Sequence, residues 1–254
     1  MKHQRTLLAG AVLSALAQIS HAQTAAQAPE AAPIQKVVVT ATPFGSGEGE
    51  QILAPAKVLA GDELREKVGS SLGETLSQEL GVSASGFGAG ASRPIIRGME
   101  GARVKMMENG MAVSDVSGLS NDHAVAAEGA VARQIEILRG PAALLYGSGA
   151  IGGLVNVVNE RIPTHLEEKP VGQAEVRYGT VDDSRNASGS VDAAFGQVGF
   201  HADGNIRRAH DYQIPGPRTL GDATSPRGRL ADSFTRQETG GAGASLIKGW
   251  GHIG

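Results

Sequence analysis

Four runs between residues 93 and 159 decide the fold, and each of them contains glycine: RPIIRG (93–98), RVKMMENG (103–110), QIEILRGP (134–141) and LLYGSGAIGGLVNVVN (144–159). Their aliphatic and β-branched residues favour short strands, and the glycines allow the chain to turn between them. Asn109-Gly110 is typical of a two-residue type I′ hairpin. Pro141 is suited to begin a brief helix through Tyr146, because a first-turn residue needs no N–H partner.

Two short helices are predicted ahead of this block, at Gly61–Lys67 and Ser71–Leu80. The second begins with a capping box, in which Ser71 is the N-cap and Glu74 follows three residues later. Its apolar face consists of Leu72, Leu76 and Leu80, and Gly81 is its stop. Helices and strands mixed within residues 51–162 predict one α+β domain of ordinary size.

The pattern changes to strict alternation from Val171 onward. Apolar or small residues occupy one set of alternate positions: Ala174, Val176, Tyr178, Ala187, Val191, Ala193, Phe195, Phe200, Ala202, Gly204 and Ile206. Polar residues occupy the other: Gln173, Glu175, Arg177, Ser188, Ser190, Asp192, His201, Asp203, Asn205 and Arg207. Such alternation is typical of membrane β-barrel strands, which are apolar toward lipid and polar toward the lumen. A half-buried soluble sheet produces the same pattern.

The connections between these strands also resemble those of a barrel. Gly179–Arg185 is short, Gly196–Val198 is a tight turn, and His210–Thr235 is a long loop rich in Pro, Gly and Asp. Four strands and the start of a fifth cannot close a barrel, because even the smallest has about eight. We therefore expect residues 171–254 to be the first strands of a longer protein, truncated or interrupted.

The first 22 residues have the organisation of a cleaved export signal. A charged start at Lys2 and Arg5 precedes an apolar stretch, Leu7–Ile19, and a small-residue cleavage site ends at Ala22. Removing residues 1–22 takes away two of the 23 basic residues and none of the 26 acidic ones, which leaves a net charge of −5. This acidity disfavours a nucleic-acid binder, and the absence of cysteine excludes disulfides and thiol-ligated metal sites.

Residues 23–50 are predicted to be a flexible tether that contains one strand-forming run at about 35–42. Its centre is Lys36-Val37-Val38-Val39-Thr40-Ala41. β-Branched residues favour an extended conformation, and an isolated strand flanked by flexible chain invites pairing with another protein. The alternative is an ordinary first strand of the following domain.

Taken in order, the four runs quoted first resemble the plug domain of TonB-dependent outer-membrane receptors. The resemblance implies an α+β plug domain followed by the first strands of an antiparallel transmembrane β-barrel, in the outer membrane of a Gram-negative bacterium. It implies that residues 36–41 form the TonB box, which pairs with the TonB protein of the inner-membrane energising complex. It also implies transport of a scarce nutrient and no enzyme activity.

Charged residues in or beside the apolar runs are expected to be paired, since an unpaired buried charge is costly. In the family that the runs resemble, similar positions look like the lock between plug and barrel, which implies this role for Arg97, Glu136 and Arg139. Glu108 is as well explained as an independent surface charge.

Two motifs match catalytic patterns but lack the required context. Gly147–Gly152 fits the dinucleotide pattern G-x-G-x-x-G, yet its short helix precedes it and its strand follows, the reverse of a nucleotide site. We expect these glycines to let the backbone bend close to the barrel wall. Gly69–Gly73 fits G-x-S-x-G without a strand–turn–helix setting. No cofactor site is therefore predicted.

The cargo is indicated by Asp122-His123, in the polar loop after the Asn-Gly hairpin. A carboxylate and an imidazole suit zinc, and the segment resembles that of the zinc-importing subgroup of these receptors. His210 and Asp211 are weaker candidate ligands, and so are the lumen-facing His201 and Asp203. Zinc or another divalent metal is the preferred cargo, and a siderophore, haem or cobalamin is the alternative. A soluble periplasmic plug-like binding or signalling module, and a nonfunctional truncated receptor, are the rival interpretations.

Overall fold

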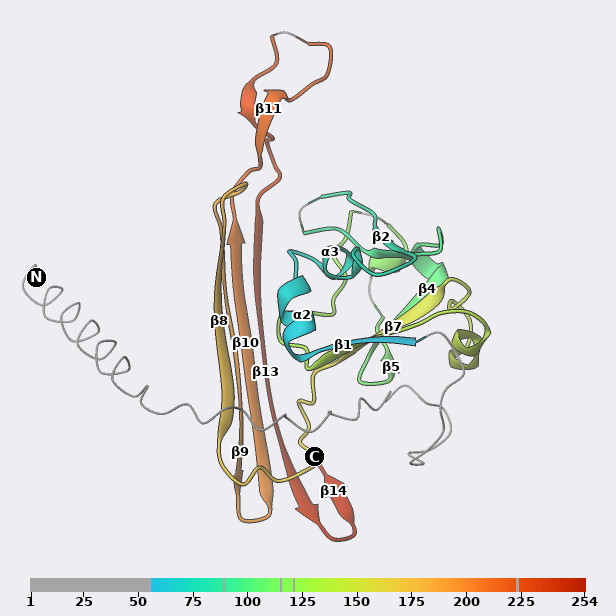
Figure 1. The fold of residues 1–254 in the computed structure, drawn as a ribbon, viewed down its shortest axis with the longest axis vertical. Helices are drawn as coiled ribbons and strands as arrows, with labels where there is room; N and C mark the ends of the chain where they lie inside the picture. Colours follow the sequence, from blue (N-terminus) through green and yellow to red (C-terminus); the bar gives the residue numbers. More distant parts are fainter. Residues whose placement is uncertain (1–55, 89, 115, 121, 223) are drawn as a thin grey trace, which may run out of the picture. The chain divides into compact units, whose positions relative to one another are not determined.

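The computed structural model describes residues 56–254 except positions 89, 115, 121 and 223, and Figure 1 shows its two main sheets. The predicted signal segment, the tether and the coupling run Lys36–Ala41 lie outside the described residues.

The first sheet has five strands in the order β1-β6-β7-β4-β5. Their bounds are β1 Ala56–Ala60, β4 Val104–Glu108, β5 Met111–Ala112, β6 Gln134–Leu138 and β7 Gly153–Val158. Only β4 and β7 pair in parallel; the other neighbours are antiparallel. Asn109 and Gly110 both have positive φ, 50° and 80°, and join β4 to β5, so the predicted hairpin is confirmed.

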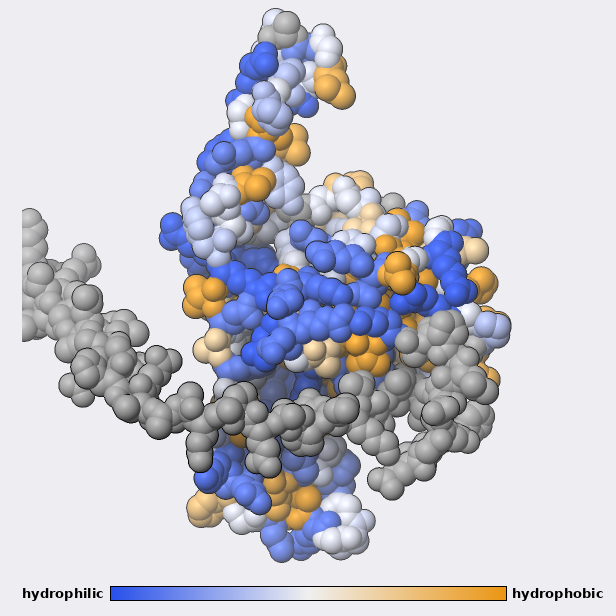
Figure 2. All heavy atoms as spheres, in the orientation of Figure 1, coloured by the Kyte–Doolittle hydropathy of each residue, from blue (hydrophilic) through white to orange (hydrophobic). Residues whose placement is uncertain are grey.

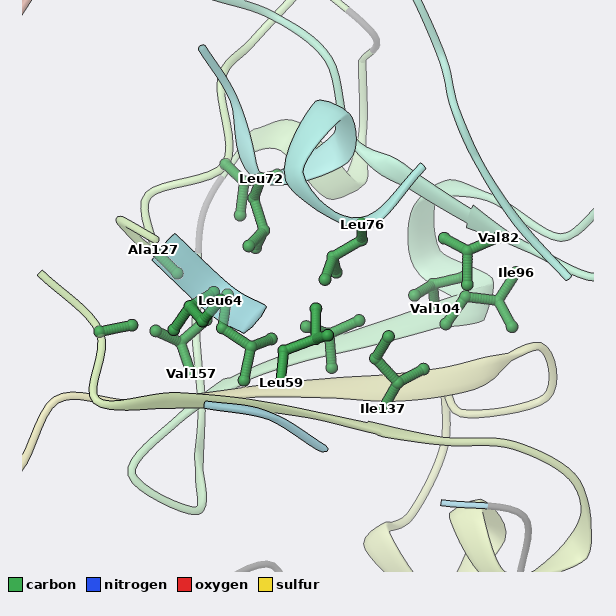
Figure 3. Packing of buried hydrophobic residues seen from close by; sticks show 14 residues of the cluster. Leu59, Leu64, Leu72, Leu76, Val82, Ile96, Val104, Ala127, Ile137 and Val157 are labelled. Atoms are coloured by element: carbon green, nitrogen blue, oxygen red, sulfur yellow. The ribbon is translucent and has the colours of Figure 1, made fainter. Parts of the chain in front are cut away.

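Two helices cover one face of this sheet: α2 Gly61–Lys67 and α3 Leu72–Leu76. Figure 3 shows Leu64, Leu72 and Leu76 pointing toward Leu59 and Val157 of the strands. Leu59, Leu76, Ile135 and Ile137 have no exposed surface. Each such side chain stabilises the fold by roughly 1.5–3 kcal/mol relative to its exposed state. The small sheet β2 Val82–Ala84 with β3 Pro94–Ile96 packs beside them through Val82 and Ile96.

The predicted second helix is wrong at its end. Ser71 is the N-cap and accepts a hydrogen bond from the Glu74 backbone N–H at 3.1 Å, as expected. The helix ends at Leu76 rather than Leu80, because the following backbone bonds are the tighter three-residue kind and Leu80 is 85% exposed. The Glu74 carboxylate accepts from the Ser70 backbone N–H at 2.6 Å rather than from the N-cap.

In the described part of the domain there are also three short 3₁₀ helices: η1 Gly101–Arg103, η2 Val116–Gly118 and η3 Pro141–Tyr146. The last begins at Pro141, as predicted. The glycines after it approach the domain's own segments: a Cβ on Gly149 would lie 2.9 Å from the Ala102 carbonyl oxygen, and one on Gly153 2.6 Å from that of Leu138. Gly149 and Gly153 therefore pack closely inside the domain, and the approach of the Gly147–Gly152 motif to the barrel wall stays a prediction.

The second sheet has the order β14-β13-β10-β9-β8 and is antiparallel throughout. Its strands are β8 Val171–Gly179, β9 Ser184–Phe195, β10 Val198–Ala209, β13 Thr235–Lys248 and β14 Gly251–Ile253. A separate hairpin, β11 Gln213–Pro217 with β12 Arg227–Arg229, lies in the long β10–β13 connection (Figure 1). We call the five-stranded second sheet the wall sheet.

Burial along the wall sheet follows the predicted alternation. On β10, for example, His201, Asn205 and Arg207 are buried whereas Phe200 and Ile206 are about half exposed. Figure 2 shows apolar side chains grouped near β14 at one end of this sheet, where Phe195, Trp250 and Ile253 are exposed. Among the described residues, no helix is both long and apolar enough to cross a membrane.

We predict that Gly153→Ala destabilises the α+β domain by about 2 kcal/mol or more, because φ is +148° there and the new Cβ would meet the Leu138 carbonyl oxygen. Limited proteolysis at increasing denaturant concentration measures the free energy of unfolding of each variant. Gly88→Ala is the matched control, since nothing lies within 4 Å of its added Cβ. Equal protease resistance in the two variants would show that the Gly153 conformation is not required.

Candidate functional site

The inward face of the wall sheet, which contacts the α+β domain, carries polar residues in rows across the strands. In one row Arg177 of β8, Asn186 of β9, Arg207 of β10 and Gln237 of β13 lie side by side in the strand register. Asn186 and Arg207 are buried. A row of long polar side chains at one level gives the sheet a strip of hydrogen-bond donors facing the domain.

The two arginines of this row bind backbone carbonyl groups at the end of α2. Arg207 donates to the Gly69 carbonyl oxygen at 2.9 Å and to that of Ser70. Arg177 donates to the carbonyl oxygens of Arg65 and Val68. A helix leaves its last carbonyl groups without backbone partners, so the Arg177 guanidinium is well matched to the end of α2. Its positive charge also complements the partial negative charge of a helix C-terminus. Arg207 binds the segment between α2 and α3.

The same row reaches a second segment of the domain through Gln237. Its side-chain amide donates to Glu128 Oε2 at 2.6 Å, and its Oε1 accepts from Arg207 at 3.2 Å. One row of the wall sheet therefore holds both the exit of α2 and the loop before β6.

A second group of contacts lies where the α+β domain continues toward the wall sheet. Arg161, three residues after β7, forms a two-pronged ion pair with Asp203 of β10, with N–O distances of 2.8 and 3.2 Å. The Asp203 side chain has no exposed surface, whereas that of Arg161 is 30% exposed. A fork of two parallel bonds is the strong geometry for an arginine–carboxylate pair.

His201 extends this pair across the sheet. Its Nδ1 lies 2.7 Å from Asp192 Oδ1 and its Nε2 lies 3.2 Å from Asp203 Oδ1. Asp192 in turn lies 3.8 Å from the Arg133 guanidinium, which also pairs with Glu160 at 3.1 Å. The buried Asp203 carboxylate is thus balanced by cationic and hydrogen-bonding neighbours, which a buried charge requires.

Two glycines of β13 make room for the Arg161 segment. Gly241 and Gly243 lie opposite Asp203 and His201 in the register. A Cβ on Gly241 would lie 2.2 Å from Arg161 Nε, and one on Gly243 1.7 Å from the Arg161 carbonyl oxygen. The segment can cross the wall sheet only because these positions carry no side chain.

We predict that Arg207→Ala speeds backbone amide hydrogen exchange at residues 69–76 by at least about tenfold, because it removes charged hydrogen bonds to this segment, each worth roughly 1.5–3 kcal/mol. Mass spectrometry of the peptide that covers these residues measures the rate. Arg208→Ala, on the outward face of the same strand, is the control. Equal exchange in both variants would mean that the inward arginine does not hold the segment.

The predicted lock residues have their identified contacts within the α+β domain. Glu136 is fully buried in β6 and accepts hydrogen bonds from Gln134 at 2.7 Å and Asn156 at 2.9 Å. Arg139 donates to the Leu80 carbonyl oxygen at 2.6 Å. Arg97 is exposed and has a positive φ of 52°. A role for these three in holding a barrel stays a prediction.

Sequence reasoning did not single out the residues that do join the two sheets: Arg133, Arg161, Arg177, Asp192, His201, Asp203 and Arg207. Most were recognised as facing the lumen, but none except His201 and Asp203 was considered a site residue, and those two only as weak metal ligands. The usable signal was the alternation itself, since an arginine at an inward position of a strand must find an acceptor inside.

Asp122 and His123 form an adjacent, exposed pair. His123 Nδ1 lies 2.8 Å from Asp122 Oδ1, and the two side chains are 47% and 52% exposed. The Ser120 hydroxyl donates to the same oxygen and holds the pKa of the Asp122 carboxyl below its ordinary value. The buried Arg93 side chain donates to the Ser117 carbonyl oxygen and so anchors the start of this loop.

His210 and Asp211 lie in the β10–β11 connection and line a pocket of about 480 Å³ with Asp183, Arg229 and Phe234. Asp211 Oδ1 accepts backbone hydrogen bonds from Ser233 and Phe234, both at 3.1 Å. Within the described part of the chain, no group of three or more His, Asp or Glu side chains is arranged to hold a metal ion. The structure therefore does not unite this pair with Asp122 and His123.

We predict that Ser120→Ala raises the pKa of Asp122 toward the ordinary value of about 3.9. Because the folded-state pKa is lowered, the stabilising contact is fully present above the ordinary pKa and is lost as the pH falls through the folded value. A ¹³C NMR titration of the carboxyl group measures the change. Asp222, whose carboxyl pKa is lowered by Thr224, serves as control and should titrate unchanged.

The fold and these contacts define a class of protein: an α+β plug held by the polar inward face of an antiparallel sheet whose outward face is largely apolar. Comparison with known proteins shows which proteins the chain resembles. Residues 49–154 match the TonB-dependent Receptor Plug Domain. This part of the chain therefore has the fold of such a plug domain, and the strands from β8 onward resemble the start of the barrel of the solved receptors.

The chain is also similar to several receptors and transporters of known description. A vitamin B12 transporter of Vibrio vulnificus (strain CMCP6) is 29% identical over 222 residues, which cover 85% of this chain and 34% of that protein. A hemin receptor of Yersinia pestis is 27% identical over 197 residues, 72% of this chain and 28% of the relative. The crystal structure of the siderophore receptor PirA from Acinetobacter baumannii has a TM-score of 0.56 at 17% identity, over 75% of this chain and 29% of that one. The chain spans about a third of the length of the curated relatives it matches.

Proposed function

We propose that this chain is part of a TonB-dependent receptor that imports a scarce nutrient across the outer membrane of a Gram-negative bacterium, after export with residues 1–22 as its signal peptide. The observation that carries the proposal is the plug domain bonded, through Arg161–Asp203 and Arg207, to a sheet of alternating polar and apolar faces. No chemical bond is made or broken in this function. Cargo binds the plug, and movement of the plug opens a path.

Energy reaches the plug through the coupling run Lys36–Ala41, which adds a strand to TonB. Strand addition is a common way of recognising an extended segment, because main-chain hydrogen bonds supply the affinity. The run precedes β1, which is an edge strand of the first sheet and pairs only with β6. Force applied before β1 therefore acts on the margin of the plug rather than on its centre.

We predict that Val38→Pro abolishes cargo uptake and cross-linking to TonB while leaving the amount of receptor in the membrane unchanged. Proline removes a backbone donor that a paired strand needs. Ala32→Pro, in the preceding proline-rich tether, is the control and should transport normally. Normal uptake by the Val38 variant would exclude residues 36–41 as the coupling strand.

For the cargo we propose zinc or another divalent metal, contacted first at Asp122 and His123. The pair is exposed, its carboxylate is held ionised by Ser120, and imidazole and carboxylate are suitable zinc ligands. A zinc site needs about four ligands, so this pair supplies at most half of them. His210 and Asp211, which the structure does not bring to this pair, are separate and weaker candidate ligands.

The second candidate cargo is a haem, a cobalamin or an iron siderophore. The names of the relatives favour it, since one is a vitamin B12 transporter and another a hemin receptor. For such a cargo, the loop that holds Asp122 and His123 would act as a polar contact surface rather than as a metal site.

The two candidates are separated by the double variant Asp122→Ala with His123→Ala. For a metal cargo we expect it to lose at least about tenfold in zinc affinity, measured by calorimetry on the purified receptor, and to fail to support zinc-limited growth. Asp62→Ala, which removes an exposed carboxylate elsewhere on the plug, is the control. Unchanged zinc uptake in the double variant, together with measurable binding of cyanocobalamin or haem, would replace the metal with an organic cargo.

A further inference from the structure

The outward face of the wall sheet carries three arginines side by side. Arg208 of β10 lies opposite Arg185 of β9 and Arg236 of β13 in the strand register, and Tyr178 of β8 continues the row beside Arg185. All four are exposed, with 63% of the Arg208 and 66% of the Arg236 side chain accessible. They point away from the plug, because the alternate residue Arg207 contacts it.

Like charges directly opposite one another on neighbouring strands are destabilising. The described residues compensate this row only in part. Glu238 lies 2.8 Å from the Arg236 guanidinium and 3.5 Å from that of Arg208. Arg185 makes no side-chain hydrogen bond or ion pair within the described part of the chain. Three guanidinium groups and one carboxylate leave an excess of positive charge on this surface.

The row lies at one edge of the apolar band. Along β10 the outward residues before it are Val198, Phe200, Ala202, Gly204 and Ile206, and Arg208 follows. From Val198 to Arg208 the strand rises about 34 Å at about 3.4 Å per residue. At a tilt of about 40° this corresponds to about 26 Å along the membrane normal, close to the roughly 25 Å height of the apolar band of an outer-membrane barrel.

The connections at the two ends of the strands tell which edge this is. At the opposite end, two-residue turns join β9 to β10 and β13 to β14. At the arginine end, residues 210–234 form the long connection that contains β11 and β12. Outer-membrane barrels place short turns in the periplasm and long loops outside, so the arginines lie at the level of the outer leaflet headgroups.

We propose, on the basis of the outer-membrane function proposed above, that Arg185, Arg208 and Arg236 form a binding site for the phosphate groups of a lipid headgroup in the outer leaflet. Arginine suits phosphate because its planar guanidinium donates two parallel hydrogen bonds to a pair of oxygens. Tyr178 has the amphipathic side chain that is enriched at membrane–water interfaces. A bound phosphate also removes the repulsion between the three aligned charges.

The test uses the complete receptor purified in detergent, with lipid A as the probe. Binding is measured by native mass spectrometry and by titration, for wild type and for the triple variant Arg185→Gln, Arg208→Gln and Arg236→Gln. We expect roughly 100-fold weaker binding in the triple variant. We also expect binding by wild type to fall with added salt, because salt screens exposed charges. Lys248→Gln, which removes an outward charge at the opposite end of β13, should bind as wild type does.

Two further binding measurements identify the chemical group that is recognised. Lipid A without its phosphates should bind wild type no better than it binds the triple variant. Inorganic phosphate should compete only weakly; if it displaces lipid A at similar concentrations, the site is a free-anion site and the lipid proposal is wrong. Equal lipid A affinity in wild type and triple variant would also overturn it. If the triple variant does not fold, judged by its heat-dependent gel migration, Arg185→Gln alone decides, because Arg185 has no internal partner to lose.

Failure of this inference is distinguishable from failure of the proposed function. A receptor that fractionates with the outer membrane and imports cargo, but does not bind lipid A through these arginines, contradicts the lipid site alone. A protein that is absent from the outer membrane contradicts the transport proposal and the lipid site together.

Discussion

The arrangement depends on one buried charge, the carboxylate of Asp203. It lies on the inward face of a strand with no access to solvent, so its burial is tolerable only if cations reach it. Arg161 supplies two hydrogen bonds and His201 a third contact. Because Arg161 directly follows the plug sheet, this pairing fixes where the plug ends and where the wall begins. Arg177 and Arg207 then hold the plug at a second place, from the end of α2 to the start of α3.

Local features of the fold were predictable because they depend on a few adjacent residues. Positive φ at Asn109 and Gly110 is what a type I′ turn requires, and Ser71 caps a helix through its own hydroxyl. The inward and outward residues of the wall sheet were also predictable, since side chains along a strand alternate strictly. The two-residue period can be read from a single strand, without knowing which residues pack against the sheet.

Partners distant in sequence were not predictable in the same way. Arg161 and Asp203 are 42 residues apart, and Arg207 reaches a carbonyl group 138 residues away. Residue type shows that an inward arginine needs an acceptor, but the identity of that acceptor depends on how two sheets meet. The predicted end of α3 was wrong for a related reason. Leu80 continues the helical spacing of apolar residues, but no neighbouring side chain covers it. Likewise, the sequence does not show that Gly149 and Gly153 lie close to the backbone of Ala102 and Leu138.

Because Gly241 and Gly243 have no side chain, the Arg161 segment can lie directly against the wall sheet. A side chain introduced at either position would separate the plug from the wall sheet, by a distance that grows with the size of that side chain. The contact between the plug and the wall sheet is therefore adjustable in small steps from the wall side, without changing any residue of the plug.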